Sequence, residues 1–236
     1  MTRSDGIVAK NANWHFRGDI ALNFDTHVSK SVPYYEEGHR LICAMSDYFI
    51  KQDSLCYELG CSTGSLSEKL VQHHPLKPGA RFVGIDREED MIALASKKQS
   101  SNPALAFVID DILQTLFDPT DLMIAYYTIH FIRPSERQKL LDRIYQALNW
   151  GGGFIMFEKV RAPDARFQDM TTGLYNDFKL DQGYTPDDIV EKSRSLKGVL
   201  EPFSSQGNID LLKRAGFQDI LTIFKYVCFE GFLAIK

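Results

Sequence analysis

The chain has 236 residues, of which 44% are hydrophobic and 25% are charged, as is ordinary for a globular domain. Its net charge of −4 argues against broad nucleic-acid binding, which requires a basic face. Four cysteines without C-x-x-C spacing, and no apolar signal core in residues 1–5, predict a reducing, cytoplasmic location. No apolar run approaches the roughly 18 residues of a membrane span, so no membrane association is expected.

From residue 55 to residue 157 the pattern alternates between strands and helices, which predicts a parallel sheet with helices on both faces. Strands are predicted at Leu55–Leu59, Arg81–Ile85, Ala104–Ile109, Leu122–Tyr127 and Phe154–Phe157, and helices at Ser65–His74, Glu89–Gln99 and Ser135–Leu148. Ser135 is the expected cap of the last helix. Residues 150–153, Trp-Gly-Gly-Gly, are expected to turn into the fifth strand.

The two ends of the chain differ from this middle part. Residues 1–50 are expected to form a helical lead-in with a helix at Tyr34–Tyr48, and residues 161–200 a helical insertion that covers the site. A helix at Asn208–Ala215 precedes two alternating segments, Ile220–Phe224 and Cys228–Ile235, which predict a terminal antiparallel hairpin. We therefore expect residues 1–236 to form one α/β domain, Rossmann-like, with a mostly parallel seven-stranded sheet.

The most informative stretch is Tyr57-Glu58-Leu59-Gly60-Cys61-Ser62-Thr63-Gly64, directly after the first strand. It resembles the nucleoside-binding loop of class I S-adenosylmethionine (SAM) methyltransferases, acidic-x-G-x-G-x-G, with Ser62 at the middle glycine. Glycines permit a tight turn and the close approach of a ligand. We assign Glu58, Gly60, Cys61, Ser62 and Gly64 to the predicted cofactor site. Cys61 could be a reactive thiol or a small residue that fills the turn.

Acidic residues end the second and third strands. Asp86 lies 26 positions after Gly60, where a carboxylate accepts hydrogen bonds from ribose hydroxyls; the alternative is a cap of the next helix. Arg87 is included in the predicted site. Asp111 could accept from the adenine amine while Ile112 packs on the ring, although Asp110 could take the polar role or the turn could be solvated. This spacing and the terminal hairpin favour a SAM fold over a nicotinamide-binding one.

A narrower resemblance runs along nearly the whole chain. It is carried by five groups of residues: 24–28 with 31–35; 134–138 with 141–142; 157–159; 177–179 with 183–184; and 213–217. Together these segments resemble carboxy-SAM synthase, which makes carboxy-SAM from SAM and prephenate for wobble-uridine modification in tRNA. The resemblance implies that Tyr35 closes over SAM, that Gly60, Asp86, Asp111 and Ile112 contact it, and that the enzyme is a homodimer sharing the insertion.

Three positions depart from that family. Tyr126 replaces an asparagine, His130 replaces a glutamine, and Ser193 stands where an arginine would hold the extra carboxylate, with Arg194 one place along. One place is about 100° on a helix, and a buried carboxylate without its partner is disfavoured. We therefore predict methyl transfer from SAM to a small-molecule acceptor, giving S-adenosylhomocysteine. The alternatives are carboxy-SAM synthesis and a non-catalytic SAM-binding protein.

The remaining candidates surround the acceptor. His130 follows strand four at the edge where α/β folds bind ligands, and its side chain suits a general base, although it could instead pack on the next helix. Tyr126 is a second catalytic and cofactor candidate. His27, Tyr127, Glu158 and Arg194 are expected to line the acceptor pocket. His73 and His74 are expected to be solvated, and no cluster with metal-ligand spacing is recognised, so no metal is predicted.

Overall fold

The computed structural model describes residues 19–98 and 102–236. Residues 1–18 of the predicted lead-in, and Gln99 at the end of a predicted helix, lie outside the described residues. The helices are α1 (Asp19–Leu22), α2 (Phe24–Ser31), α3 (Tyr35–Ser46), α4 (Ser65–His73), α5 (Glu89–Lys98), η1 (Ile129–Phe131), α6 (Pro134–Ala147), α7 (Ala165–Asp181), α8 (Pro186–Ser195) and α9 (Ser205–Ala215). The strands are β1 (Leu55–Leu59), β2 (Arg81–Asp86), β3 (Leu105–Ile109), β4 (Thr120–Tyr126), β5 (Leu148–Lys159), β6 (Asp219–Tyr226) and β7 (Phe229–Ile235).

The strands form one sheet in the order β3-β2-β1-β4-β5-β7-β6. The first five are parallel, and β7 runs antiparallel between β5 and β6. This confirms the predicted seven-stranded sheet with a terminal hairpin. Since parallel strands end at the same edge, the acidic residues that close β1 and β2 come together there.

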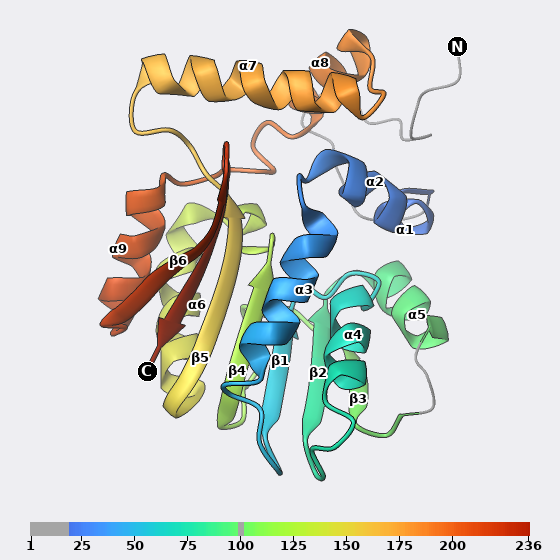
Figure 1. The fold of residues 1–236 in the computed structure, drawn as a ribbon, viewed down its shortest axis with the longest axis vertical. Coiled ribbons are helices and arrows are strands. Elements are labelled where there is room, and N and C mark those ends of the chain that lie inside the picture. The colour runs from blue at the N-terminus through green and yellow to red at the C-terminus, as the bar shows by residue number, and fades with distance from the viewer. Residues whose placement is uncertain (1–18, 99–101) are drawn as a thin grey trace.

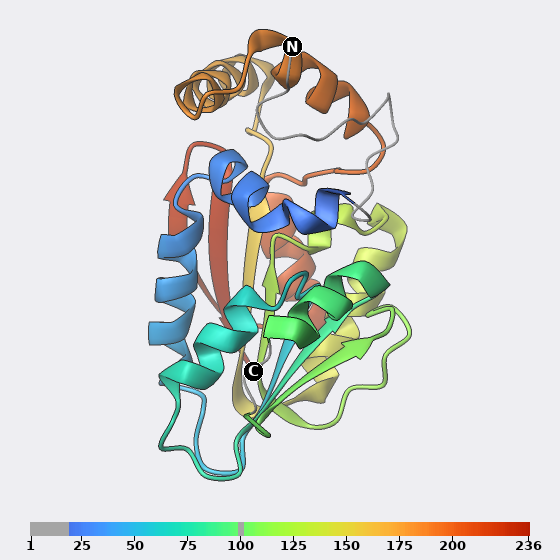
Figure 2. The same cartoon turned by 90° about the vertical axis from the view of Figure 1, so that its right-hand side faces the viewer.

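Helices cover both faces of the sheet (Figures 1 and 2). Residues that alternate along each strand point to opposite faces, and they divide the core into two clusters. Ile124 and Ile155 belong to the cluster of α3 and α4, whereas Met123 and Phe154 belong to the cluster of α6 and α9. Because both faces are packed, the central strands are apolar throughout, and Leu122–Ala125 are fully buried.

Two predicted boundaries are wrong, each for a local reason. Ser135 does not cap α6, because the helix already begins at Pro134, with Arg133 at the cap position and no side-chain cap bond; proline suits a first helical position. Residues 150–153 are not a turn before β5 but part of that strand. The end of the chain continues the ladder there, since Gly151 N donates to Lys236 O and Lys236 N donates to Gly152 O.

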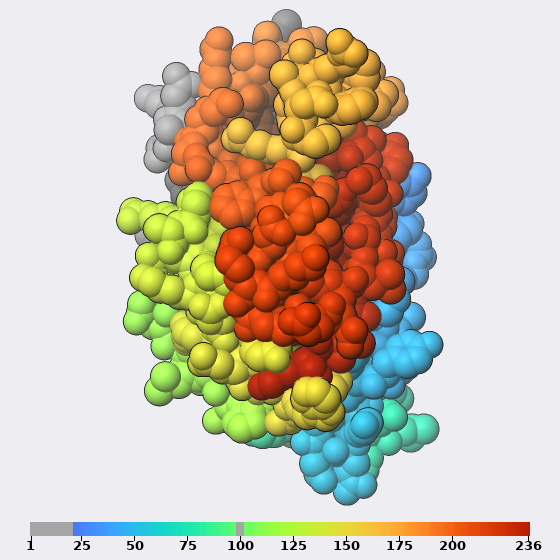
Figure 3. Space-filling model, turned by 90° about the vertical axis from the view of Figure 1, so that its left-hand side faces the viewer, coloured from blue at the N-terminus to red at the C-terminus, as the bar shows by residue number. Residues whose placement is uncertain are grey.

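The segment after β5 crosses the carboxyl edge of the sheet. Figure 1 shows α7 and α8 along the top, with α2 beneath them, and the space-filling view shows α7 end-on above α9 (Figure 3). The hydroxyl of Tyr175 on α7 donates to Ser31 O at 2.8 Å, and the Tyr184 and Ser31 hydroxyls lie 3.0 Å apart. These bonds join the insertion to the lead-in. In the described part of the chain, no helix has the length and apolarity that a membrane crossing requires.

Candidate functional site

A cavity of about 800 Å³ opens at the carboxyl edge of the sheet. Its walls come from α2, from the ends of β1, β2 and β4, and from the segment that includes α7 and α8. This volume suits a drug-sized ligand. Of the predicted site residues, the cavity is lined by His27, Tyr35, Glu58, Gly60, Cys61, Ser62, Asp86, Arg87, Asp111, Ile112, Tyr126, Tyr127 and His130.

Hydrogen bonds to the end of β2 and packing against Thr128 hold the glycine loop in place. The amides of Gly60 and Cys61 both donate to Ile85 O, at 2.8 and 3.0 Å. Gly60 has φ +72°, and a Cβ there would lie 2.6 Å from Thr128 Cγ2. The requirement for glycine therefore comes from a positive φ and from the Thr128 side chain. Ser62, at φ +49°, takes a left-handed conformation that non-glycine residues adopt infrequently.

Asp86 is held by two backbone amides. Ser62 N donates to Oδ2 at 2.9 Å, and Glu88 N donates to Oδ1 at 3.0 Å. Burial raises the pKa of this carboxyl, and the two amide bonds oppose the rise. Each oxygen keeps a second lone pair, so the carboxylate could still accept from a pair of vicinal hydroxyls. Asp86 does not cap α5, because Glu88 precedes the first residue of that helix, Glu89; its two amide bonds hold the loop and leave the predicted ribose contact possible.

Glu58 is the most deeply placed acid of the cavity, with 5% of its surface exposed. Its Oε2 accepts a hydrogen bond from the Ser67 hydroxyl of α4. Burial raises the pKa of Glu58 to about 8, although the hydrogen bonds from Ser67 oppose the rise. Near neutral pH this residue therefore carries a proton in a large share of molecules.

Two acidic residues in the turn after β3 have different hydrogen-bond partners. Asp110 accepts from Asp111 N and from the Thr115 hydroxyl, so it organises the turn. Asp111 accepts from Leu113 N through Oδ1, which leaves Oδ2 available toward the cavity. Ile112 is 8% exposed. Asp111 is therefore better placed than Asp110 for a polar contact with a base. Arg87 lies at the rim, 3.4 Å from Glu88.

Three tyrosines form the wall beneath α3. The hydroxyl of Tyr126, a predicted catalytic group, donates to Tyr35 O at 2.6 Å and fills the space beside Gly38. Burial strongly raises the pKa of Tyr126, so proton transfer by this residue is not supported by its surroundings. Tyr127, at φ +59°, stacks on Tyr35 with ring centroids 6.4 Å apart.

His130 and Glu158 meet on the opposite side of this wall. Nδ1 of His130 lies 3.1 Å from Oε2 of Glu158, and their side chains are 2% and 1% exposed. Lys159 N donates to Nδ1 at 3.2 Å, while Glu158 Oε1 accepts from Ile129 N at 3.0 Å. Because Nδ1 accepts from the Lys159 amide, a neutral ring carries its hydrogen on Nε2, and His130 and Glu158 form a buried acid–base pair. Glu158 is thus placed behind His130 and not in the acceptor wall.

Lysines gather where the insertion meets the cavity. Lys192 of α8 donates to His27 Nε2 at 2.5 Å and to the Ser31 hydroxyl at 2.7 Å. Lys159 ends β5 with its ammonium 4.2 Å from the centroid of the Tyr175 ring, and burial lowers its pKa. Both lysines line the cavity. Lys179 lies on the Tyr175 ring as well, at 4.5 Å, and burial together with Lys159 lowers its pKa to about 8.

Arg194 does not join this group. It is exposed on α8 and is not part of the cavity wall, so its predicted position in the acceptor pocket of its own chain is not supported. Lys192, which the sequence analysis did not single out, lies there instead. The sequence could have indicated Lys192, because residues two apart on a helix point in nearly opposite directions. Only one of Lys192 and Arg194 can therefore face α2.

The charged residues of the cavity are unevenly distributed. Glu58, Asp86 and Asp111 line the side of β1–β3, Lys159 and Lys192 line the side of the insertion, and Arg133 and Glu136 line it near the start of α6. The acidic side could hold the hydroxyls and amine of a nucleoside, and the lysines could hold a carboxylate. His130 follows β4, which lies between β1 and β5 in the sheet.

The fold and this site define a class I SAM-dependent enzyme. A family model described as a methyltransferase domain matches residues 57–152. Among solved structures, human N-acetylserotonin methyltransferase in complex with SAM is similar with a TM-score of 0.64 at 21% identity, over 94% of this chain and 57% of that one. Magnesium protoporphyrin IX methyltransferase from Synechocystis, with bound S-adenosylhomocysteine, gives 0.60 at 19% identity, over 89% and 86%.

Curated relatives narrow the class. Carboxy-S-adenosyl-L-methionine synthase from Staphylococcus epidermidis is 34% identical over 94% of this chain and 97% of its own length. The enzymes of that name from Campylobacter lari and Helicobacter hepaticus are 36% and 37% identical, each over 94% of this chain and 94% and 95% of their own. The chain belongs to the carboxy-SAM synthase family. This favours the alternative function of the sequence analysis over methyl transfer to a small acceptor.

Proposed function

We propose that this enzyme converts SAM to carboxy-SAM, using a small carboxylated donor that the family resemblance identifies as prephenate. The observation that carries the proposal is the pair of cavity lysines, Lys159 and Lys192, in a chain so similar to enzymes of that name. They supply positive charge on the side of the cavity where the expected arginine is absent, so Ser193 no longer excludes a bound carboxylate.

The nucleoside half of SAM is assigned to the acidic side. Asp86 would accept from the ribose hydroxyls, Asp111 Oδ2 from the adenine amine, and Ile112 would pack on the base. Gly60, Cys61 and Ser62 would shape the floor beneath it, with Glu58 and Arg87 at its inner and outer ends. Gly64, which was predicted to join them, does not line the cavity and instead packs against Phe107 and Ala95. Tyr35 would cover the bound molecule, since it already stacks on Tyr127 across the cavity wall.

Carboxy-SAM carries a carboxylate in place of one hydrogen of the methyl group. Its formation removes a proton from that carbon, and the resulting carbanion adds to CO2 released from the donor. In prephenate the electron pair that CO2 leaves behind would expel the ring hydroxyl as hydroxide, which takes up the proton as water. SAM supplies a sulfonium that makes the methyl carbon reactive. We assign the handling of a proton to the buried His130–Glu158 pair. Lys159 and Lys192 would orient the carboxylates, and the buried tyrosines would exclude water.

A second function, methyl transfer from SAM, is favoured by one observation: Ser193 stands where the family resemblance places an arginine. One assay separates the two. Incubation with SAM and prephenate, followed by mass spectrometry, should yield carboxy-SAM. Production of S-adenosylhomocysteine with a small acceptor, and of no carboxy-SAM, would support methyl transfer and overturn the proposal.

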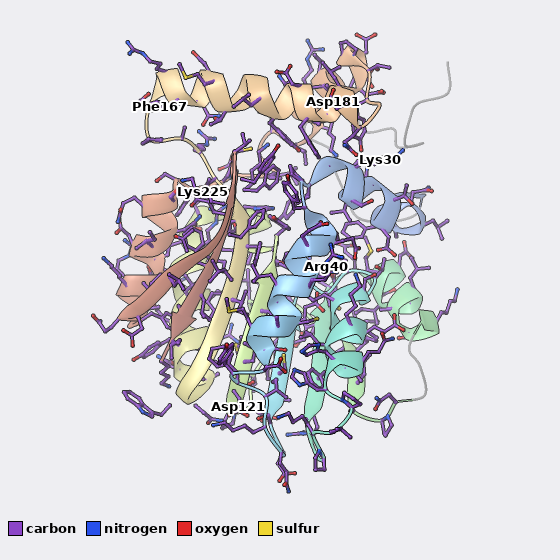
Figure 4. All side chains as sticks on the ribbon, viewed as in Figure 1. Lys30, Arg40, Asp121, Phe167, Asp181 and Lys225 are labelled. Atoms are coloured by element: carbon purple, nitrogen blue, oxygen red, sulfur yellow. The ribbon has the colours of Figure 1, made fainter. Side chains whose placement is uncertain are left out.

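We also propose a homodimer formed through α7. Only Lys179 of this helix is buried, whereas Phe167, Met170 and Leu174 are 51%, 56% and 56% exposed. Their spacing places them on one face, and Figure 4 labels Phe167 near the start of the helix and Asp181 at its end. Light scattering should give twice the chain mass, and Met170→Glu with Leu174→Glu should give the monomer. The four buried, unpaired cysteines support a cytoplasmic location.

A further inference from the structure

Asp47, His73 and His74 form a cluster at the opposite edge of the sheet from the cavity. Asp47 follows the last residue of α3, His73 is the last residue of α4, and His74 follows it. Figure 1 shows the ends of α3 and α4 side by side at the edge away from α7. One ligand atom from each residue lies within 4.8 Å of the others. None of the three lines the cavity.

The distances fit a shared cation. His73 Nε2 lies 3.1 Å from Asp47 Oδ2, and His74 Nδ1 lies 3.8 Å from Asp47 Oδ1. In a tetrahedral zinc site with bonds of about 2.0–2.2 Å, neighbouring ligand atoms are about 3.3 Å apart. The two measured separations lie on either side of that value, so a small movement of the exposed Asp47 side chain would bring all three groups onto one ion.

Ser46 fixes the tautomer of His74. The Ser46 hydroxyl lies 2.6 Å from Cys43 O and 2.7 Å from His74 Nε2. The hydroxyl has one hydrogen. It donates that hydrogen to the Cys43 carbonyl, because carbonyls in the last turn of a helix have no backbone N–H partner within the helix. It must then accept from His74 Nε2–H. The lone pair of His74 is therefore on Nδ1, the atom that faces Asp47 at 3.8 Å.

Two lone-pair groups facing each other at this distance make no hydrogen bond, and a cation between them would satisfy both. The Ser46–His74 bond is the kind of outer contact that orients a metal-bound histidine. The C-terminal ends of α3 and α4 also meet here, and the partial negative charge of a helix C-terminus favours a cation. Imidazole ligands select a transition metal over magnesium or calcium.

We propose that Asp47, His73 and His74 bind one divalent transition-metal ion, for which zinc is the probe, with a fourth position for water. The ion would tie the end of α3 to the end of α4. This site is separate from the catalytic cavity and requires no metal in the reaction. The sequence analysis missed it because Asp47 is 26 residues from His73 and only the fold brings them together. It also wrongly predicted that His74 is solvated, whereas His74 is buried.

The test is a zinc titration of the metal-free, full-length protein by calorimetry, with melting temperature as a second readout. We expect one ion per chain and a higher melting temperature with zinc. Asp47→Asn and His73→Asn, both at exposed positions, should each weaken binding at least roughly tenfold. Ser46→Ala should weaken it while leaving all three ligands in place. Glu68→Gln, on the same face of the fold but without a ligand role, is the matched control.

Cobalt distinguishes this site from the cysteines and from the cavity histidines. Cobalt bound by nitrogen and oxygen gives visible absorption without a thiolate charge-transfer band, and His73→Asn should remove it. A thiolate band, zinc binding unchanged in both Asp47→Asn and His73→Asn, or no zinc binding at all would each overturn the proposal. Loss of binding in His130→Asn but not in His73→Asn would place the ion in the cavity and would also overturn it.

Discussion

The imidazole of His130 in η1 and the carboxyl group of Glu158 near the end of β5 are buried against each other, 3.1 Å apart. β4 and β5 are parallel, with Tyr126 opposite Phe157, so the residues that follow them emerge side by side. Lys159 N donates to Nδ1 of the same ring, so the two groups are a buried base and acid placed to exchange a proton.

Glu158→Gln should lower kcat by roughly 10²–10⁴-fold, with little change in the KM for SAM. The amide keeps the shape of the pocket but removes the carboxyl group that exchanges a proton with His130. Steady-state kinetics as a function of pH would measure this. Glu230→Gln is the control, because Glu230 pairs with Glu158 across β5 and β7 and is equally buried but outside the cavity wall. Equal losses in both variants would show a structural effect alone.

Asp86→Ala should weaken SAM binding by roughly 100-fold, because charge-assisted hydrogen bonds contribute about 1.5–3 kcal/mol each. Calorimetry would measure the affinity, and circular dichroism would check that the loop, which Asp86 also holds through Ser62 N, remains folded. Asp90→Asn in the first turn of α5 serves as the control. Unchanged affinity in Asp86→Ala would rule out its assignment to the ribose.

Lys192→Met should raise the KM for the carboxylated donor by roughly 10–100-fold and leave the affinity for SAM within about twofold. The neutral side chain keeps the packing of the lysine stem but loses its charge beside His27. Lys197→Met, at an exposed position nearby, should behave as the unmodified enzyme. A loss of SAM affinity with an unchanged KM for the donor would show that Lys192 contacts SAM and not the carboxylated donor, which contradicts its assignment.

Glu58 should make the ligand-free protein less stable as the pH rises. Burial raises its pKa to about 8 in the folded state, above the ordinary value near 4.3 in the unfolded chain. The folded state therefore binds more protons between these values, and its stability falls from about pH 5 to pH 8. Glu58→Gln should remove this part of the slope, on the order of a few kcal/mol, in denaturation at several pH values. The same slope in both proteins would contradict the assignment.

The order of strands and the acidic residues at their ends could be predicted from the sequence because they depend on local patterns. Asp86 ends the strand Arg81–Asp86, 26 residues after Gly60 of the glycine loop, and a parallel sheet has few ways to arrange such units. The terminal hairpin was equally local, since alternation marks both strands and Val227 and Cys228 make the short turn between them.

The remaining features depend on contacts between distant segments. Glu158 and His130 are 28 residues apart, and Lys192 meets His27 across 165 residues, so no spacing rule connects them. Tyr126 was predicted to face the chemistry because it ends a strand, yet its hydroxyl is taken by Tyr35 O. The start of β5 was missed because its partner is the end of the chain, at Lys236.

The mass of the nucleoside that co-purifies with the protein tests the central claim most directly. The enzyme, released from its bound ligand by heat and analysed by mass spectrometry, should yield carboxy-SAM, heavier than SAM by one carboxyl group in place of hydrogen. Lys192→Met should retain less of it than Lys197→Met does. Recovery of SAM or S-adenosylhomocysteine alone, from cells able to supply the donor, would contradict carboxy-SAM synthesis.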